Sequence, residues 1–466
     1  MVKQKNVDML SGNIAKGLLL ITLPIMAMNI MNSLFHIVDM TILKAGDSAG
    51  GSMSVGAVGV CGTLITLITC WVTGISVGAN VVVAKYIGKK KTQLVLESVG
   101  TGLAFAVIGG LALVVIGLLF AEIFLGWINC PDELMKDAAL YFRTYFLGMP
   151  FFMIYTFGSA IARSEGDGKT NMNYAIVSGI LKICLTYVFV IVFKLSIIGV
   201  SIATIISWIV PSALYIIHFI KSETVVKFQL KFFKINWPIF KEMVAIGLPT
   251  GVQNALYSVA NAVISSVVNS FGAAATTGIS IANTFDGLLY QISISPSMAV
   301  IPYVSQNMGA GNFKRVRKTI TNGIFVTVAF GLTFGILSAI FSAELSSIMS
   351  DVPEVIAYSQ QKMILISSTY FICGIQEIYG GALKGLGKAI AHTITTLVFM
   401  CGLRFVWVYF IFPLFPKDHA LTYLYLVWPV GWVLSVITLL IMFIFTIKKL
   451  EKTYGAKEEK QPLKAV

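Results

Sequence analysis

Residues 18–43 read LLLITLPIMAMNIMNSLFHIVDMTIL, an apolar stretch long enough to cross a bilayer as a helix. The stretch nevertheless contains Asp39, and a carboxylate in hydrocarbon costs about 2.5–3.5 kcal/mol on insertion scales. His36 lies three residues earlier, on the same helical face. Pro24 removes a backbone donor and predicts a hinge in this helix. We interpret Asp39 as a proton site of a transporter. The alternative is a structural aspartate that is satisfied by a neighbouring side chain.

The composition of the whole chain agrees with a membrane protein. Of its 466 residues 57% are hydrophobic and only 12% are charged, whereas soluble domains contain about 25% charged residues. The six cysteines are scattered singly and the four histidines are dispersed, so the sequence predicts no metal site, no disulfide framework and no catalytic site. The first apolar segment is too long for a signal peptide and is expected to remain as a membrane helix. We therefore expect a transporter rather than an enzyme, and an uncoupled channel is disfavoured by the bulky, asymmetric halves.

The apolar segments predict an all-α, polytopic protein with twelve transmembrane helices. They cover residues 16–43, 54–86, 93–120, 135–162, 171–193, 197–220, 239–268, 274–306, 318–343, 354–383, 389–414 and 421–447. Most of the 34 Lys and Arg residues fall on one side of this topology, while Lys362 and a few others fall on the other side. The positive-inside rule then places both termini in the cytoplasm. The net charge of +13 follows from this topology, so no nucleic-acid partner is expected.

Three signals recur in the same order in the two halves of the chain. A Leu-Pro pair opens the first and seventh helices, and glycine-rich, basic segments end the second and eighth helices and the fourth and tenth helices. The repeat predicts two pseudo-symmetric six-helix lobes around a central cleft. The predicted parts are an N-lobe (1–221), a cytoplasmic linker (222–236) with a strand-like or amphipathic pattern, a C-lobe (237–447) and a charged, disordered cytoplasmic tail (448–466).

Several segments in register resemble the multidrug and toxic compound extrusion (MATE) family, closest to its bacterial DinF- and MepA-like members. The segments are ARSEGDGKTNM (162–172), VSQNMGAGNFKRVRK (304–318), GGALKGLGK (380–388), RFVWVYFIFPLF (404–415) and WPVGWVL (428–434), together with Pro24 and Asp39. The resemblance covers nearly the whole chain. It implies alternating access and the export of cationic or amphipathic drugs in exchange for protons or sodium.

Some positions depart from the family pattern. Family members often carry Asn and Asp in the fifth helix, where this chain has Lys182 and Thr186. Members with a sodium site place acids in the seventh and tenth helices, where this chain has Tyr257 and Cys373. Sodium coupling is therefore disfavoured, because hard cations need several oxygen ligands. We hypothesise that Lys182 pairs with Asp39 and that a proton or a substrate cation competes for the carboxylate. The alternative is a fixed ion pair that only joins two helices.

Charged residues in the second half are paired by their predicted depth in the membrane. Asp286 and Arg404 lie at similar depth and are expected to pair, whereas Glu377 faces the inner vestibule or meets Lys384. Further candidates for substrate contact are polar residues in membrane helices: Asn32, Thr186, Thr204, Ser207, Gln253 and Asn254. Ser and Thr hydroxyls in helices often bond only to their own backbone, which is the alternative for three of these.

Together these features predict a monomeric proton-coupled drug antiporter in a bacterial cytoplasmic membrane. Its partners would be small organic cations and the lipid bilayer, and no cofactor is expected apart from the coupling ion. The rival functions are a sodium-coupled drug antiporter and a flippase for a lipid-linked precursor. A flippase would need a cationic cavity. We assign only two cations, Lys182 and Arg404, to the membrane segments, and we expect both to be paired. No phosphate-binding loop of the G-x-x-x-x-G-K-[ST] type is present.

Overall fold

The structure, a computed structural model, describes residues 7–46, 51–128, 130–416 and 420–460. Within these ranges the chain is predominantly helical and contains no strand. The side chains of 36–37, 39–40, 43–46, 51–55, 63 and 455–460 also lie outside the described part of the protein, so those of His36 and Asp39 are not among the described residues.

The predicted twelve-helix architecture is confirmed, because each predicted range coincides with one helix or one run of consecutive helices. The elements are α1 (Ile14–Gly46), α2 (Gly51–Gly88), α3 (Thr92–Trp127), α4 (Asp132–Leu147), α5 (Met149–Ser164), α6 (Gly168–Tyr187) with the π-helical turn η1 (Val188–Val192), α7 (Ser196–Lys221), η2 (Leu230–Phe232), α8 (Trp237–Asn269), α9 (Ala273–Gly309), α10 (Phe313–Ile340), α11 (Ser342–Ser347), α12 (Pro353–Gly385), α13 (Ala389–Thr396), η3 (Leu397–Gly402), α14 (Leu403–Val406), η4 (Trp407–Ile411), η5 (Phe412–Leu414), α15 (Ala420–Tyr425) and α16 (Val427–Lys460).

Hydropathy separates these helices into two groups. In the described part of the chain, eight helices are long and apolar enough to cross a membrane, and the pair α4 and α5, bent by 50°, makes a ninth span. The long helices α8, α9 and α12 fall outside this group because they contain more polar residues. In a membrane, such helices need an environment other than lipid on their polar faces.

Contacts divide the chain into two compact units. Unit 1 comprises Met1–Val7 and Ala27–Gly251, and unit 2 comprises Asp8–Met26 and Val252–Val466. These boundaries differ from the predicted lobes, because the first part of α1 packs in unit 2 and the first part of α8 packs in unit 1. The chain changes unit two residues after Pro24 in α1 and two residues after Pro249 in α8. Both prolines lie inside continuous helices.

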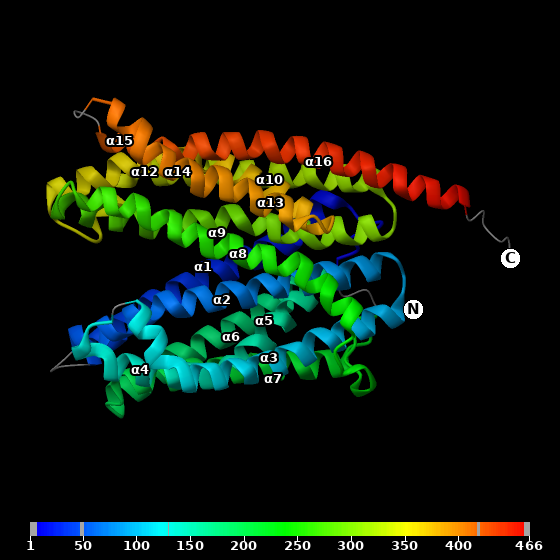
Figure 1. Cartoon of the computed structure of the whole chain (residues 1–466), viewed down its shortest axis with the longest axis horizontal. Coiled ribbons are helices and arrows are strands. Elements are labelled where there is room, and N and C mark those ends of the chain that lie inside the picture. Colours follow the sequence, from blue (N-terminus) through cyan, green and yellow to red (C-terminus); the bar gives the residue numbers. More distant parts are fainter. Residues whose placement is uncertain (1–6, 47–50, 129, 417–419, 461–466) are drawn as a thin grey trace. The chain divides into compact units, whose positions relative to one another are not determined.

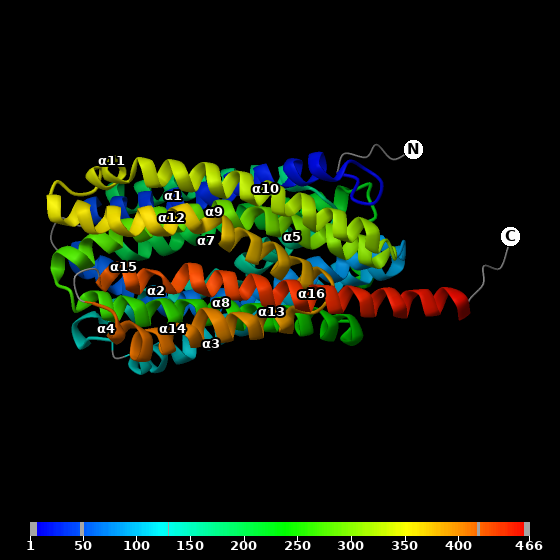
Figure 2. The same cartoon turned by 90° about the horizontal axis from the view of Figure 1, so that it is seen from above.

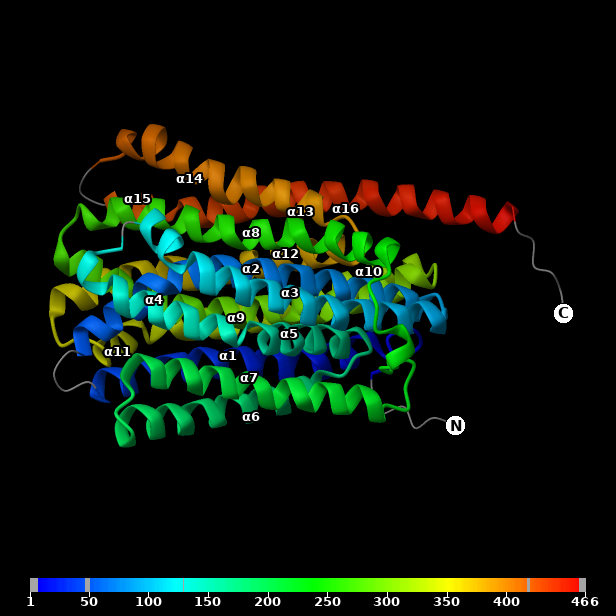
Figure 3. The ribbon, with the colours of Figure 1, turned by 60° about the horizontal axis from the view of Figure 1, so that its bottom comes forward.

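In unit 1 the first part of α8 packs backbone to backbone against α2. Gly74 and Gly78 of α2 face Gly247 and Gly251 of α8, and a Cβ at Gly74, Gly78 or Gly247 would overlap the facing backbone. Each helix thus contributes a G-x-x-x-G spacing, which allows helices in membranes to approach closely. An ion pair between Lys85 of α2 and Glu242 of α8 lies further along the same pair of helices. Figure 3 shows α6 and α7 side by side in the same unit.

In unit 2 the most extensive packing joins α9, α10 and α12, which lie side by side in Figures 1 and 2. The segment that precedes α1 is held here by side chains of the α9–α10 turn. Asn307 donates to the carbonyl oxygen of Met9 at 3.0 Å, and Arg315 donates to the same oxygen at 2.9 Å and to the carbonyl of Gly12. The motif at 304–318 therefore anchors the start of the first helix to unit 2.

The segment 222–236 is not a free linker, because it packs on α3 in unit 1. It is extended apart from the short turn η2, and the backbone carbonyl of Phe232 lies against Gly100 of α3. The amide of Asn236 donates to Thr101 Oγ1 at 3.1 Å, and the Asn236 side chain donates to Glu97 at 2.8 Å. These bonds fix the start of α8 relative to α3.

The expectation of a disordered tail from residue 448 onward is wrong for most of this segment. Helix α16 continues to Lys460, and its last turns extend beyond the neighbouring helices of unit 2 (Figure 2). Two contacts with α10 stabilise this extension: Glu451 pairs with Arg317 at 2.8 Å, and Tyr454 packs edge-on against Phe313 with ring centroids 5.3 Å apart. Charged residues with good helix propensity can continue a helix that packing has already started.

Candidate functional site

Helices of unit 2 bring charged, amide and aromatic side chains together at one level of the bundle. Measured along the helices at about 1.5 Å per residue, the polar members lie about 12–20 Å from the helix ends near the α8–α9 turn. We call this group the polar cluster; it consists of Asn261 (α8), Asn283 and Asp286 (α9), Lys362 (α12), Arg404 (α14) and Trp428 (α16).

A buried ion pair forms one half of the polar cluster. Lys362 Nζ lies 2.8 Å from Asp286 Oδ2, and the two residues are only 3% and 8% exposed. Lys362 also donates to Asn283 Oδ1, and its ammonium lies 5.7 Å from the centroid of the Trp428 ring. The carboxylate and the ammonium therefore neutralise each other inside the helix bundle.

Arg404 forms the other half of the polar cluster and has a different environment. It is 3% exposed, and its Nη1 donates to the amide oxygen of Asn261 at 2.6 Å. The guanidinium lies over the Trp428 ring, 5.1 Å from the centroid. Among the described residues, no carboxylate lies within ion-pair distance of Arg404. Within the described part of the chain, the positive charge of Arg404 is therefore not balanced by an acidic side chain.

The predicted pair of Asp286 with Arg404 is wrong. Both residues lie at a similar depth, as expected, but Lys362 of the adjoining helix α12 occupies the position beside Asp286. The Lys and Arg distribution assigned Lys362 to the outer side, although it lies nine residues inside α12 and also inside the predicted helix 354–383. Its position along that predicted helix was the signal that could have placed Lys362 within the span, near the depth of Asp286.

A second polar group lies further along α12. Glu377 is 2% exposed, its Oε1 has no hydrogen-bond partner, and its backbone carbonyl accepts from Ser297 at 2.6 Å. Lys384 lies seven residues later on the same helical face and interacts electrostatically with Glu377, but the two form no ion pair within the described structure. Of the two predicted settings for Glu377, proximity to Lys384 agrees with the structure.

The remaining candidates of unit 2 are amides on α8. Gln253 is buried, and its side-chain oxygen has no hydrogen-bond partner, whereas Asn254 is half-buried. Tyr257 accepts a hydrogen bond from Gln376 of α12 at 3.1 Å. Uncharged groups therefore join α8 to α12 at this level.

The candidates of unit 1 are brought less clearly together. Lys182 is half-buried and Thr186 is buried on α6, while Asn32 is exposed on α1. Thr204 donates to the carbonyl of Val200, and Ser207 donates to the carbonyl of Thr204, so both hydroxyl protons are used within helix α7. The alternative of bonding to their own backbone is thus the observed one for Thr204 and Ser207. The predicted contacts of Asp39 and His36 fall on side chains outside the described residues.

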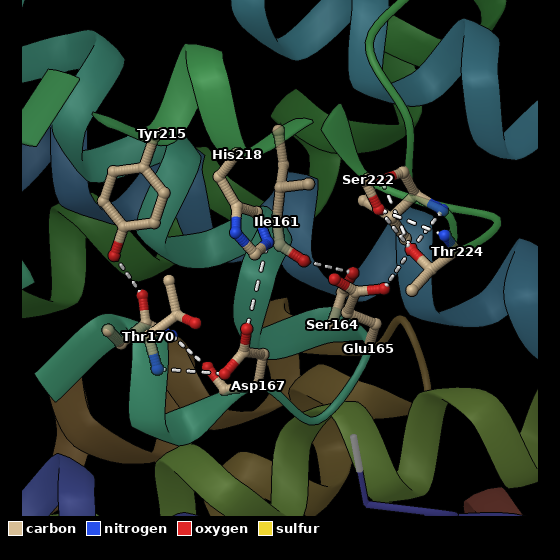
Figure 4. Close-up of polar contacts among 11 residues, drawn as sticks. Ile161, Ser164, Glu165, Asp167, Thr170, Tyr215, His218, Ser222 and Thr224 are labelled. Atoms are coloured by element: carbon tan, nitrogen blue, oxygen red, sulfur yellow. Dashed lines mark hydrogen bonds and ion pairs between the residues drawn. The ribbon is translucent and has the colours of Figure 1, made fainter. Parts of the chain in front are cut away.

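A third group, shown in Figure 4, joins the α5–α6 turn to the end of α7. Asp167 caps α6 by accepting from the amide of Thr170 at 2.9 Å, and its other oxygen lies 3.9 Å from Nε2 of His218. Glu165 accepts from the Thr224 hydroxyl at 2.7 Å. The sequence predicted no metal site, yet one donor atom from each of Glu165, Asp167 and His218 lies within 4.8 Å of the others. The capping and hydrogen bonds give this group a structural role.

Comparison with known proteins agrees with this arrangement. Residues 24–188 and 249–410 match the MatE family. The "Probable multidrug resistance protein YoeA" of Bacillus subtilis (strain 168) is 24% identical over 396 residues, which cover 84% of this chain and 85% of the relative. A "FAD transporter" of Shewanella oneidensis is 22% identical over 355 residues, 74% of this chain and 78% of the relative.

The fold is also that of solved transporters. The structure titled "Outward-facing conformation of a multidrug resistance MATE family transporter of the MOP superfamily" superposes with a TM-score of 0.88 at 18% identity, and the match covers 96% of this chain and 99% of the other. The family match extends over both halves of the chain and includes Pro24, Asp286 and Glu377. The chain therefore belongs to the MatE family of multi-span membrane transporters.

Proposed function

We propose that this protein is a secondary antiporter that exports organic cations and amphipathic drugs in exchange for protons. Asp39 is the coupling carboxylate, with His36 and Lys182 beside it, and Pro24 is the hinge of α1. Family membership supports transport, and the position of Asp39 in the part of α1 that belongs to unit 1 supports a role in that unit. Export of drugs is in keeping with the name of the Bacillus relative.

The ion pair of Asp286 with Lys362 is the observation that favours protons over sodium. A sodium ion needs several oxygen ligands, and in unit 2 the Lys362 ammonium already lies 2.8 Å from the carboxylate that would have to supply them. Glu377 has the charge of Lys384 acting on it from the same helix. The two buried carboxylates described in unit 2, Asp286 and Glu377, thus each have a lysine near them, and we assign coupling to Asp39.

Protonation of Asp39 and binding of a cation at Asp39 exclude each other in this mechanism. When a proton enters, the carboxylate loses its charge and no longer attracts either Lys182 or a cationic substrate. Each charge that crosses the membrane with the potential supplies about 2.3 kcal/mol per 100 mV, to which the pH gradient adds. In this proposal the protein works as a monomer in the bacterial cytoplasmic membrane. The distribution of Lys and Arg supports a cytoplasmic position for both termini.

Proteoliposomes loaded with ethidium test this function. A pH gradient and a sodium gradient are imposed separately on the wild type, on Asp39→Asn and on the control Asp351→Asn, which changes an exposed carboxylate between α11 and α12. We expect efflux with the pH gradient alone, its loss in Asp39→Asn and its retention in the control. Efflux that is driven only by sodium and survives in Asp39→Asn would contradict proton coupling at Asp39.

One observation favours the alternative of a lipid-linked precursor flippase. Such a substrate carries phosphate, and Arg404 is a buried cation without a carboxylate partner among the described residues. Movement of a fluorescent lipid pyrophosphate between leaflets, measured in the same vesicles without an ion gradient, would establish this alternative. We expect no such movement.

A further inference from the structure

We propose that the polar cluster of unit 2 binds an anionic group carried on an aromatic ring, with Arg404 as the charged contact and Trp428 as the aromatic one. The inference rests on the proposed export function and specifies a chemical class of substrate: aromatic amphiphiles with a carboxylate or a similar acid. In one half of the cluster the cation Lys362 has the acidic partner Asp286. In the other half the cation Arg404 has no acidic partner among the described residues, and the proposal rests on this difference.

Arg404 has an unbalanced charge in a buried place. A guanidinium has five N–H donors, and the structure gives Arg404 one hydrogen bond, to the neutral amide of Asn261. The titratable groups that act on it, Tyr257, Tyr370, Cys373 and Cys401, are all uncharged at neutral pH. Buried cations are normally paired, because an unpaired charge in a protein interior is costly. An incoming anion would supply the missing partner.

Lys362 is the second buried cation of the polar cluster, and unlike Arg404 it has an acidic partner. Its charge is compensated by Asp286, and the exposed Asn283 accepts a further bond from it. Asp286 forms no described ion pair with Arg404. The polar cluster contains two cations, Lys362 and Arg404, and one anion, Asp286, so it carries one net positive charge. A cationic substrate would be repelled here, whereas a carboxylate would be attracted and could bind the planar guanidinium through two parallel hydrogen bonds.

Trp428 gives the site its preference for a ring. The indole is half-buried, and both Arg404 and Lys362 lie within 6 Å of its centroid, at 5.1 and 5.7 Å. The cation–π contact with the indole and the hydrogen bond to Asn261 hold the guanidinium in place before a ligand arrives. A flat anionic ligand would then contact a prearranged cation and an aromatic surface together, which lowers the entropy cost of binding.

The cluster is accessible to a solute from water rather than from lipid. Asn261 and Asn283 are both exposed although they lie about 12–15 Å inside their helices. An exposed amide facing hydrocarbon would leave its hydrogen-bonding groups unsatisfied at a cost of several kcal/mol. These two residues also belong to α8 and α9, which are less apolar than the eight helices that qualify as membrane spans in the described part of the chain. The face that leads to Arg404 is therefore wetted.

Two dyes that differ in one charge test the proposal. Rhodamine B carries a free carboxylate, and its ethyl ester has the same rings without that negative charge. Binding to the purified full chain in nanodiscs of neutral lipid is measured by fluorescence anisotropy. We expect the wild type to bind rhodamine B more tightly than the ester, and Arg404→Gln to weaken rhodamine B binding by about ten- to a hundredfold while changing the ester less than about threefold.

A second variant, Asn261→Asp, keeps Arg404 and changes the neighbouring side chain without changing its size. Asn261→Asp places a carboxylate where Arg404 now contacts an amide, so it should abolish the preference for rhodamine B without removing a side chain. Lys384→Gln is the matched control, because it removes a buried cation of unit 2 outside the polar cluster, and it should retain the preference. Trp428→Leu should weaken both dyes.

The outcomes separate this inference from the proposed function. Equal affinity of the wild type for both dyes would overturn it, as would an equal loss of both dyes in Arg404→Gln or an unchanged preference in Asn261→Asp. These measurements use no ion gradient. A failure of proton coupling would appear only in the ethidium efflux experiment, and a failure of anion recognition would appear only in the dye preference.

Discussion

Removal of Lys362 should destabilise the protein strongly, because it leaves Asp286 buried without its counter-charge. At 2.8 Å and an effective dielectric constant of about 20, the attraction between the two charges is about 6 kcal/mol. Desolvation of both groups offsets much of this in the intact pair. When Lys362 is lost the attraction disappears while the desolvation cost of the Asp286 carboxylate remains, so we expect Lys362→Met to lower the free energy of unfolding by about 3–5 kcal/mol. Replacement of both partners in Lys362→Met/Asp286→Leu should recover most of that loss.

Thermal unfolding of the purified single and double variants in one detergent, followed by intrinsic fluorescence, measures this difference. Lys362→Met should unfold at the lowest midpoint temperature. The double variant should unfold at a higher temperature, close to that of the wild type. A single variant as stable as the wild type would show that Asp286 is not held by Lys362. A double variant no better than the single one would show that the loss comes from packing around Lys362 rather than from the unpaired charge.

Three further predictions concern the anchors of the helices that change unit. Gly78→Leu should lower stability by about 1–3 kcal/mol, since its side chain would overlap the α8 backbone, whereas Gly62→Leu, with open space around it, should not; midpoint temperatures compare the two. Arg315→Gln should cost about 1–2 kcal/mol and speed hydrogen exchange at residues 9–14. Pro249→Ala should slow ethidium efflux about two- to tenfold by restoring a backbone hydrogen bond, whereas Pro302→Ala, inside α9 of unit 2, should not.

The helical architecture was predictable because its signals are local. Each span is an apolar run bounded by charged or glycine-rich turns, and the order of those turns repeats between the halves. The packing of α2 on the first part of α8 was not predictable in this way. It depends on glycines at 74, 78, 247 and 251, which are distant in sequence and acquire meaning only when the two helices face each other. The helical tail was missed because contacts with Arg317 and Phe313 stabilise it.

The polar cluster shows the same limit for side chains. Depth along a helix placed Asp286 and Arg404 at one level, and the structure agrees. Rotation about the helix axis decides which neighbour a residue meets, and depth carries no information about rotation. Lys362 therefore took the position expected for Arg404, and Arg404 was left with an amide and the Trp428 ring.

Helices α1 and α8 each begin in one unit and end in the other. The start of α1 is fixed to unit 2 by Asn307 and Arg315, and the start of α8 is fixed to unit 1 by close glycine contacts with α2. Each helix then enters the other unit just past a proline, Pro24 or Pro249. Proline lacks the backbone donor that would resist bending, so each of these helices bends at the lowest cost near its proline. Asp39 lies about four turns beyond Pro24, so such a bend would move it together with the second part of α1.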